Sequence, residues 1–356
     1  MKVPLRAALQ ACAIGMGLMV CFFLALVPLA DIIMAIPRPV RVWLITGAMA
    51  PIYLTAGGWI RWRFGAAIMR PLVAGSVVQA LLLFSIRMSA EADGAQYNEV
   101  AFGWPGLLLA LTMPPLGGLL GARLPARQER PLAPEGKAAL TAALLWVGLE
   151  FVLRRDGTLL LAQLTGSVQG GDMLAVLPGF PLLALLIARL GKVRGLGRER
   201  WGVRWDRTAL AAGLAGGVLM LALLPVTTRL DFRLFGQATA QLAAQAGAGT
   251  AHPLWVASLL MVTNGLVIPV TEELAWRGVI QSGLTLALGV LRGLLLTAGL
   301  FALKHVLVDG SAARLTTLLM LSLVLGLVRW RWGTGASIAA HVVMNLGGTA
   351  LLLLAP

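Results

Sequence analysis

Long apolar runs follow one another along most of the chain and are separated by short polar loops. A helix crosses the hydrocarbon core of a bilayer with about 20 such residues. The stretches that meet this requirement, with soft edges, are 7–29, 42–60, 67–86, 102–122, 138–153, 172–190, 208–227, 253–270, 289–308, 313–329 and 336–355. They are too long and unbroken for barrel strands, so the pattern predicts an all-α, polytopic transmembrane helix bundle of about 10–12 membrane helices.

The composition indicates that lipid, and not water, surrounds much of this protein. Hydrophobic residues make up 58% of the 356-residue chain and charged residues 12%, whereas a soluble fold needs about a quarter charged residues to cover its surface. Its two cysteines, Cys12 and Cys21, share one apolar run, which excludes a secreted disulfide scaffold. We therefore expect a multi-pass protein of the cell membrane, with a bacterial inner membrane as the expected location.

The net charge of +14 comes from short basic clusters between the apolar runs. This distribution is typical of helix orientation and of contact with anionic headgroups, so the lipid bilayer is the expected partner and no nucleic acid is expected. The clusters fall mainly in alternate loops, which predicts a cytoplasmic amino terminus, although Arg38, Arg41, Arg154 and Arg155 lie on the opposite side. The first run is too long for the apolar core of a signal peptide, so it is expected to remain as an uncleaved helix.

The basic, glycine-containing stretch 189–207 is the one convincing linker. It predicts an amino-terminal helix block over 1–207 and a second block over 208–356. No internal repeat is visible, so an inverted-repeat transporter has no direct support. The spacings Gly117-xxx-Gly121 and Gly213-xxx-Gly217 suit close helix contacts in lipid.

Ionisable residues inside apolar runs are costly in a bilayer and each one requires a reason. In the segment Thr271-Glu272-Glu273-Leu274-Ala275-Trp276-Arg277, helix geometry places Glu273 and Arg277 one turn apart, so they are expected to pair. Glu272 lies about 140° round the helix from Arg277 and is left as the free acid. Two neighbouring carboxylates in a low dielectric resist joint ionisation, which can make one of them a general base. The structural alternative is a buried ion pair beside a glutamate that snorkels to a helix end.

The next predicted helix carries Phe301-Ala302-Leu303-Lys304-His305. With a turn near 288, an antiparallel hairpin places Glu272 and His305 at similar membrane depth, where the two side chains could hold and polarise one water molecule. Alone, His305 would more simply be a packed core or interface residue. Lys304 is expected to face elsewhere or to snorkel, because it lies about 100° round the helix from His305.

The last predicted helix places His341 and Asn345 one turn apart, and both side chains can donate a hydrogen bond to an oxygen, as an oxyanion hole requires. Hydrogen bonding between helices is the structural alternative. Simple up-and-down threading does not bring His341 to the depth of His305. Glu150 and Arg154 are expected to pair, while Asn264 and Gln79 are expected to make packing contacts.

Taken in order, Glu-Glu-xxx-Arg, Phe-xxx-His and His-xxx-Asn resemble the CAAX-processing and bacteriocin-processing (CPBP or Abi) intramembrane protease family, which includes the type II CAAX prenyl endopeptidases. The resemblance covers about 208–356 and implies an intramembrane glutamic-type endopeptidase that acts on a membrane-anchored or lipidated protein or peptide. It implies that Glu272 activates water with His305 as its partner and that His341 and Asn345 stabilise the oxyanion. Supporting roles fall to Glu273 and Arg277, which organise the site, and to Phe301, which packs it.

Metal chemistry and two other functions remain open at this point. A divalent metal such as zinc could be held by Glu272, Glu273, His305 and His341, but the HExxH spacing is absent, and we expect a metal-free mechanism with no cofactor. The alternatives to a protease are an ion-coupled transporter that uses Glu272 and His305 as a proton relay, and a non-catalytic scaffold or immunity protein of the same fold.

Overall fold

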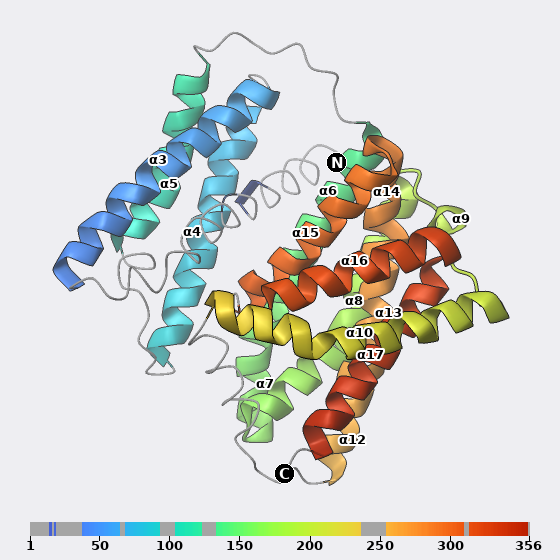
Figure 1. Cartoon of the computed structure of the whole chain (residues 1–356). Helices are drawn as coiled ribbons and strands as arrows, with labels where there is room; N and C mark the ends of the chain where they lie inside the picture. The colour runs from blue at the N-terminus through green and yellow to red at the C-terminus, as the bar shows by residue number, and fades with distance from the viewer. Residues whose placement is uncertain are drawn as a thin grey trace. The chain divides into compact units, whose positions relative to one another are not determined.

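The computed structural model describes residues 14, 15, 18, 38–64, 68–92, 104–122, 133–235, 254–309 and 313–354. All regular structure within these residues is helical, which confirms the predicted all-α bundle (Figure 1). The chain forms two compact units, Met1–Pro131 and Leu132–Pro356. The predicted span 7–29 lies almost entirely outside the described residues.

The first unit contains three described helices, α3 (Arg38–Phe64), α4 (Met69–Ala92) and α5 (Trp104–Gly121). Close packing of α3 on α5 depends on glycine, as the predicted small-residue spacing requires. A Cβ atom at Gly117 would lie 2.0 Å from the carbonyl oxygen of Leu54, and one at Gly121 would lie 2.5 Å from that of Gly58. The two helix backbones therefore approach so closely at Gly117 and Gly121 that neither glycine could carry a side chain.

The second unit contains the remaining described helices. Its α-helices are α6 (Pro134–Val152), α7 (Thr158–Thr165), α8 (Val168–Val193), α9 (Arg198–Trp201), α10 (Arg207–Phe235), α12 (Leu254–Val262), α13 (Ile268–Glu273), α14 (Gln281–Leu288), α15 (Val290–Asp309), α16 (Leu315–Trp332) and α17 (Thr334–Leu354). Its π-helical segments are η3 (Leu153–Gly157), η4 (Thr263–Val267) and η5 (Leu274–Ile280). These helices follow the predicted apolar runs, except for α9, which lies in the basic linker. The run 138–153 extends through η3 and α7 to Thr165, and the run 253–270 extends to Leu288.

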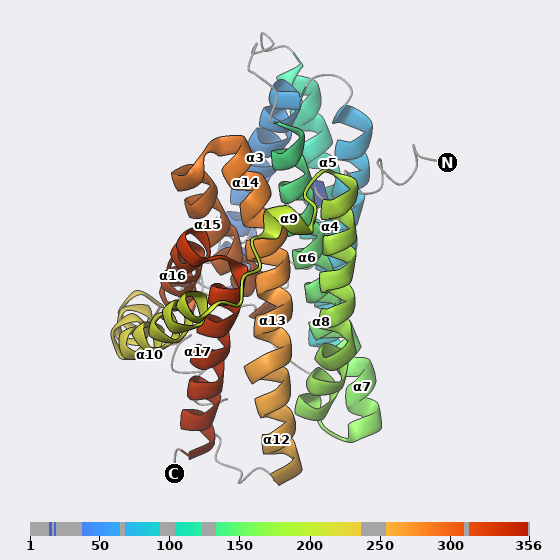
Figure 2. The ribbon, with the colours of Figure 1, turned by 90° about the vertical axis from the view of Figure 1, so that its right-hand side faces the viewer.

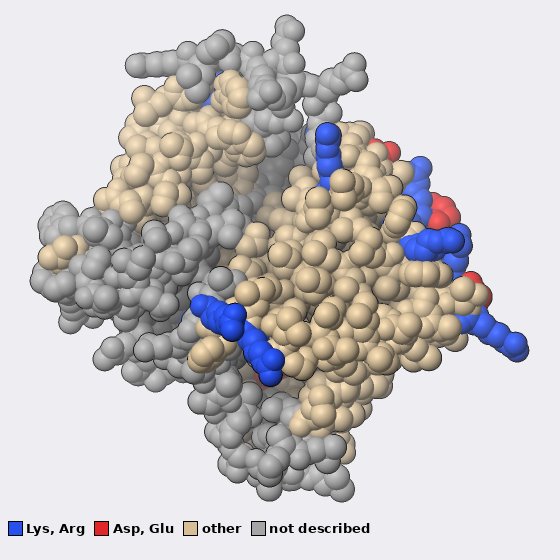
Figure 3. All heavy atoms as spheres, in the orientation of Figure 1, with Lys and Arg blue, Asp and Glu red and all other residues tan. Residues whose placement is uncertain are grey.

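Six helices of the described part of the chain are long and apolar enough to cross a membrane. They are Pro134–Thr165, Gly170–Val193, Arg207–Arg233, Val256–Leu288, Val290–Asp309 and Leu315–Trp332. The protein is therefore a multi-pass membrane protein, and the total of about 10–12 helices stays a prediction. Where the second unit faces the viewer in Figure 3, its described surface is mostly free of charge, and Lys and Arg gather mainly along the edge beside α9.

Residues 254–288 form one long rod, which α10 crosses steeply (Figures 1 and 2). The rod ends at Leu288, and Gly289, with φ of 82°, turns the chain back into α15, as the predicted turn near 288 requires. Glycine also brings α10 against α17, because a Cβ atom at Gly213 would lie 2.6 Å from the carbonyl oxygen of Ala336. The rod and α15 thus form an antiparallel pair with α17 beside them.

The boundary between the compact units lies at 131/132, whereas the division predicted from the basic linker lies at 207/208. Helices α6 and α8 come before the basic linker but pack on the rod, α6 against α14 and η5, and α8 against α13. They therefore contribute to the same unit as 208–356. The separate functional role of 1–207 stays a prediction.

Candidate active site

The rod that carries the Glu-Glu pair is widened twice by π-helical turns, over Thr263–Val267 and Leu274–Ile280. Such turns are rare and are often found at functional sites, because they shift side chains and release backbone groups from the regular hydrogen-bond ladder. In the first turn, the carbonyl oxygen of Asn264 accepts a hydrogen bond of 2.8 Å from Asn345 Nδ2. The second turn begins directly after Glu273.

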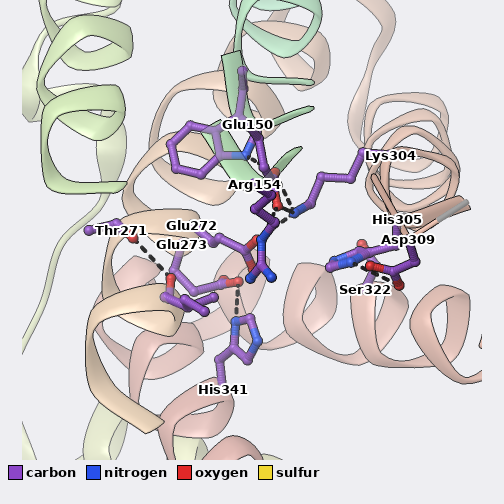
Figure 4. Close-up of polar contacts among 12 residues, drawn as sticks. Glu150, Arg154, Thr271, Glu272, Glu273, Lys304, His305, Asp309, Ser322 and His341 are labelled. Carbon is purple, nitrogen blue, oxygen red and sulfur yellow. Dashed lines mark hydrogen bonds and ion pairs between the residues drawn. The ribbon is translucent and has the colours of Figure 1, made fainter. Parts of the chain in front are cut away.

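Glu273 lies at the centre of a fully buried polar cluster. Its Oε2 is 3.4 Å from Arg277 Nε, which confirms the predicted pair, and its Oε1 is 3.1 Å from His341 Nδ1 (Figure 4). The guanidinium of Arg277 also donates to Ser322 Oγ at 3.0 Å. The carboxylate therefore joins the rod to α17, and the guanidinium joins it to α16.

Glu272 does not stand free, because its Oε1 forms an ion pair with Lys304 Nζ. The same ammonium lies 3.0 Å and 2.8 Å from the two carboxylate oxygens of Glu150 on α6. Lys304 is 1% exposed. The expectation that it faces elsewhere or snorkels is thus wrong, because the helix-wheel argument compared it only with His305 and left out the acids on α6 and α13.

Glu150 is held from two further sides. Trp146 Nε1 donates to its Oε2 at 2.6 Å, and Arg154 Nε lies 3.6 Å from its Oε1, which confirms the predicted Glu150–Arg154 pair. Arg154 also lies 3.7 Å from a carboxylate oxygen of Asp172, whose side chain is 37% exposed. The charges thus alternate in sign from this half-exposed acid to the buried Glu272.

Phe301 is the apolar centre around which the predicted groups assemble. Its ring is 0% exposed, its centroid lies 5.2 Å from that of His305 and 6.4 Å from that of His341, and the Arg277 guanidinium lies 4.5 Å from it. Both histidines therefore border one ring, although simple threading did not bring them to one depth. The reason is that α16 lies between α15 and α17 in sequence but crosses the bundle obliquely.

His305 approaches the acid of its own helix, with Nδ1 4.0 Å from Asp309 Oδ2. Its Nε2 is buried without a hydrogen-bond partner among the described residues. The structure places no hydrogen bond or ion pair between His305 and Glu272, and Figure 4 shows His305 apart from the contact that Glu272 makes with Lys304. His305 packs on Phe301, and Lys304, the partner of Glu272, lies 5.0 Å from the centroid of the same ring.

His341 and Asn345 lie on one face of α17 as predicted, but each already has a protein partner. His341 contacts Glu273 and Asn345 donates to the backbone of Asn264. The Asn264 side chain in turn donates to Thr349 Oγ1 at 2.7 Å, which is the packing role expected for it. Gln79, in the first unit, likewise makes a packing contact, since it donates to Tyr53 at 2.8 Å.

The candidate metal ligands do not form a metal centre in this arrangement. Within the described ranges, no group of three or more His, Cys, Asp or Glu side chains is placed to hold a metal ion. Glu272 is paired with Lys304, Glu273 with Arg277 and His341, and His305 approaches Asp309. These side chains would have to exchange their partners to bind a divalent cation.

The link between Glu150, Lys304 and Glu272 was not predicted from the sequence. A signal was present, because Lys304 is a charged residue inside an apolar run and such a residue needs a named partner. The partner could not be chosen from spacing, since Glu150 lies 154 residues away in the chain. Trp146 and Asn264 were also missed as parts of the site, because their contacts depend on helix packing and on a π-helical turn.

Comparison with protein families supports the resemblance carried by the three motifs. Residues 253–347 match the family model described as type II CAAX prenyl endopeptidase Rce1-like. The matched segment contains all three motifs and excludes Glu150. This match points to a CAAX-type protease that acts in the membrane. Neither the curated proteins nor the solved structures gave a match.

Proposed function

We propose that this protein, whose residues 253–347 carry the Rce1-like pattern, is an intramembrane glutamic-type endopeptidase. Its substrate would be a membrane-anchored or lipidated protein or peptide. The observation that carries the proposal is the burial of two acids, an arginine and a histidine in one linked cluster, with Phe301 packed against Arg277, His341 and the part-buried His305. Groups this costly in a bilayer interior indicate function.

In the proposed reaction, Glu272 accepts a proton from a water molecule whose oxygen attacks the carbonyl carbon of the scissile bond. The proton then passes to the departing amine nitrogen as the carbon–nitrogen bond breaks, so no external reactant is required. His305 would help to hold the water through Nε2, the buried nitrogen that has no protein partner. Glu272 and His305 need not touch each other for this, because one water molecule can bridge two groups that lie beyond direct contact.

His341 and Asn345 would stabilise the negative charge that develops on the carbonyl oxygen. Asn345 uses one of its amide hydrogens on Asn264 and keeps the second for a substrate. His341 contacts Glu273 through Nδ1, so its Nε2 is the nitrogen available to the oxyanion, and it donates there when the ring carries both protons.

Unpaired polar atoms beside Phe301 support a place for water or a peptide. Trp276 Nε1 and Arg277 Nη1 are buried without hydrogen-bond partners in the described part of the chain, as is His305 Nε2. Trp276 packs edge-to-face on Phe301 with centroids 5.4 Å apart. Buried polar atoms are usually satisfied by protein or water, so these three are the natural contacts of a solvent molecule or a substrate amide.

The proposal is tested by comparing the membrane proteomes of cells that carry the wild-type protein or Glu272→Ala. The matched control is Glu199→Ala, which changes an exposed glutamate on α9. We expect a longer, uncleaved precursor of a membrane-associated protein to accumulate only with Glu272→Ala. Identical precursor and product levels in all three strains, with equal amounts of the three proteins, would contradict a proteolytic role of Glu272.

A further inference from the structure

We propose that Lys304, held in place by Glu150, is a positioning residue for the carboxylate of Glu272. This inference rests on the proposed function of Glu272 as the group that activates water. It adds two residues to the site, one of which, Glu150, lies outside the segment that matches the protease family. The two residues act through Glu272 and not on the substrate.

The hydrogen-bonding capacity of Lys304 is fully used by the two acids. A lysine ammonium has three N–H donors. Its Nζ contacts Glu150 Oε1, Glu150 Oε2 and Glu272 Oε1, which gives one acceptor for each donor (Figure 4). All three donors of the ammonium are therefore in use, and none is left for another partner. The position of the ammonium fixes the position of Glu272 Oε1.

Glu150 is itself fixed more firmly than Glu272. Trp146 Nε1 donates to Glu150 Oε2 at 2.6 Å, and Arg154 Nε lies 3.6 Å from Glu150 Oε1. The side chain of Glu150 is 0% exposed. Trp146 is in turn packed edge-to-face on Phe180 of α8, with centroids 5.6 Å apart. Glu150 thus holds Lys304 at the α6–α8 pair, and Lys304 in turn holds Glu272 of the rod.

This arrangement supplies what a buried catalytic carboxylate needs. A carboxylate in a low-dielectric interior is costly unless it is paired. Lys304 places one positive charge between the carboxylates of Glu272 and Glu150, and Arg154 adds a second positive charge beside Glu150, so Glu272 can be held in one orientation within the bilayer. Without the ammonium, no positive charge would lie between the carboxylates of Glu150 and Glu272, and the two would repel each other. A misplacement of about 1 Å can reduce a rate about 100-fold.

The kinetic test uses the full-length protein in proteoliposomes and an internally quenched, farnesylated peptide that ends in a CAAX sequence. In Lys304→Met we expect kcat to fall about 100-fold while KM stays within about threefold, because the substrate contacts are unchanged. Lys304→Arg keeps the charge and should recover at least about a tenth of the wild-type kcat, and Glu150→Gln should lose about tenfold. Lys137→Met, at an exposed lysine on α6, is the matched control and should leave both constants unchanged.

A second measurement needs no substrate and detects the pairing itself. Unfolding of Lys304→Met, Glu272→Gln and the double variant in mixed micelles forms a double-mutant cycle. We expect the double variant to be less destabilised than the sum of the single variants. Strict additivity would overturn the inference, because it would mean that the ammonium and the carboxylate do not interact.

The outcomes separate this inference from the proposed function. Unchanged kcat in a folded Lys304→Met protein, or a change confined to KM, would overturn the positioning role and leave the protease proposal standing. Absence of turnover by wild-type protein, together with no accumulating precursor in the Glu272→Ala strain, would overturn the proposed function and the positioning role with it. The double variant Lys304→Met/Glu150→Gln removes one charge of each sign and so keeps the charge balance. Recovery of kcat by Lys304→Arg, but not by this double variant, would support positioning over simple charge balance.

Discussion

The buried pair between Glu273 and Arg277 allows a stability prediction that can be worked from the contacts. The perturbation is Glu273→Ala, which removes the carboxylate and leaves the guanidinium, 0% exposed, in place. His341 loses its partner at the same time. The remaining partners of Arg277 are Ser322, at 3.0 Å, and the Phe301 ring, at 4.5 Å.

Breaking a buried ion pair by removing one partner costs about 3–5 kcal/mol, because the other charge is left uncompensated. The retained cation–π contact of Arg277 contributes about 2 kcal/mol when desolvated, and its bond to Ser322 contributes a similar amount. These contacts persist in the variant and partly compensate the guanidinium that is left, so we expect destabilisation of about 3 kcal/mol, at the lower end of that range. The double variant Glu273→Ala/Arg277→Met removes both charges and should be more stable than Glu273→Ala alone.

The assay is unfolding of the purified protein by increasing SDS in mixed micelles, followed by tryptophan fluorescence. Glu199→Ala, at an exposed position, is the control and should change the free energy of unfolding by less than about 0.5 kcal/mol. The reasoning would be refuted if Glu273→Ala behaved like this control. It would also be refuted if the double variant lost as much stability as the sum of both single variants, since the pair would then contribute no coupling.

The remaining predictions concern the imidazole, the metal, transport and the first unit. His305→Ala should lower kcat about 100-fold in a folded protein, because the attacking water loses a group that positions it, and unchanged turnover would exclude His305 from the site. Dialysis against a metal chelator should leave peptide turnover intact, whereas loss of activity that zinc restores would show a metal-dependent enzyme. Proteoliposomes should show no proton flux that depends on Glu272, and such a flux without proteolysis would favour the transporter. Gly117→Leu should destabilise the first unit, because even a Cβ atom would lie 2.0 Å from a carbonyl oxygen of α3, and an unchanged unfolding midpoint would contradict that packing.

Most helices of the fold could be predicted from sequence because they follow long apolar runs. Runs such as 172–190 and 289–308 correspond to α8 and α15 within a few residues. The turn after Leu288 was predictable too, since glycine is favoured where φ is positive. The compact-unit boundary at 131/132 was not, because a basic, glycine-containing linker does not show which helices pack across it.

Part of the site followed from local geometry, and the rest required tertiary contacts. The Glu273–Arg277 pair lies within one element, and spacing alone predicted it. The link from Glu150 through Lys304 to Glu272 needed the approach of three helices, including α6, which lies outside the three motifs. The π-helical turns at 263–267 and 274–280 are also invisible to a helix wheel, which assumes a constant angle per residue.

The most direct test of the account is turnover of the quenched farnesylated peptide by purified Glu272→Gln protein in proteoliposomes. Glutamine keeps the shape of the side chain and can still contact Lys304, but it cannot accept a proton from water. The account predicts that wild-type and Glu199→Gln proteins release the carboxy-terminal fragment and that Glu272→Gln releases none above background. Wild-type rates in a folded Glu272→Gln protein would contradict it.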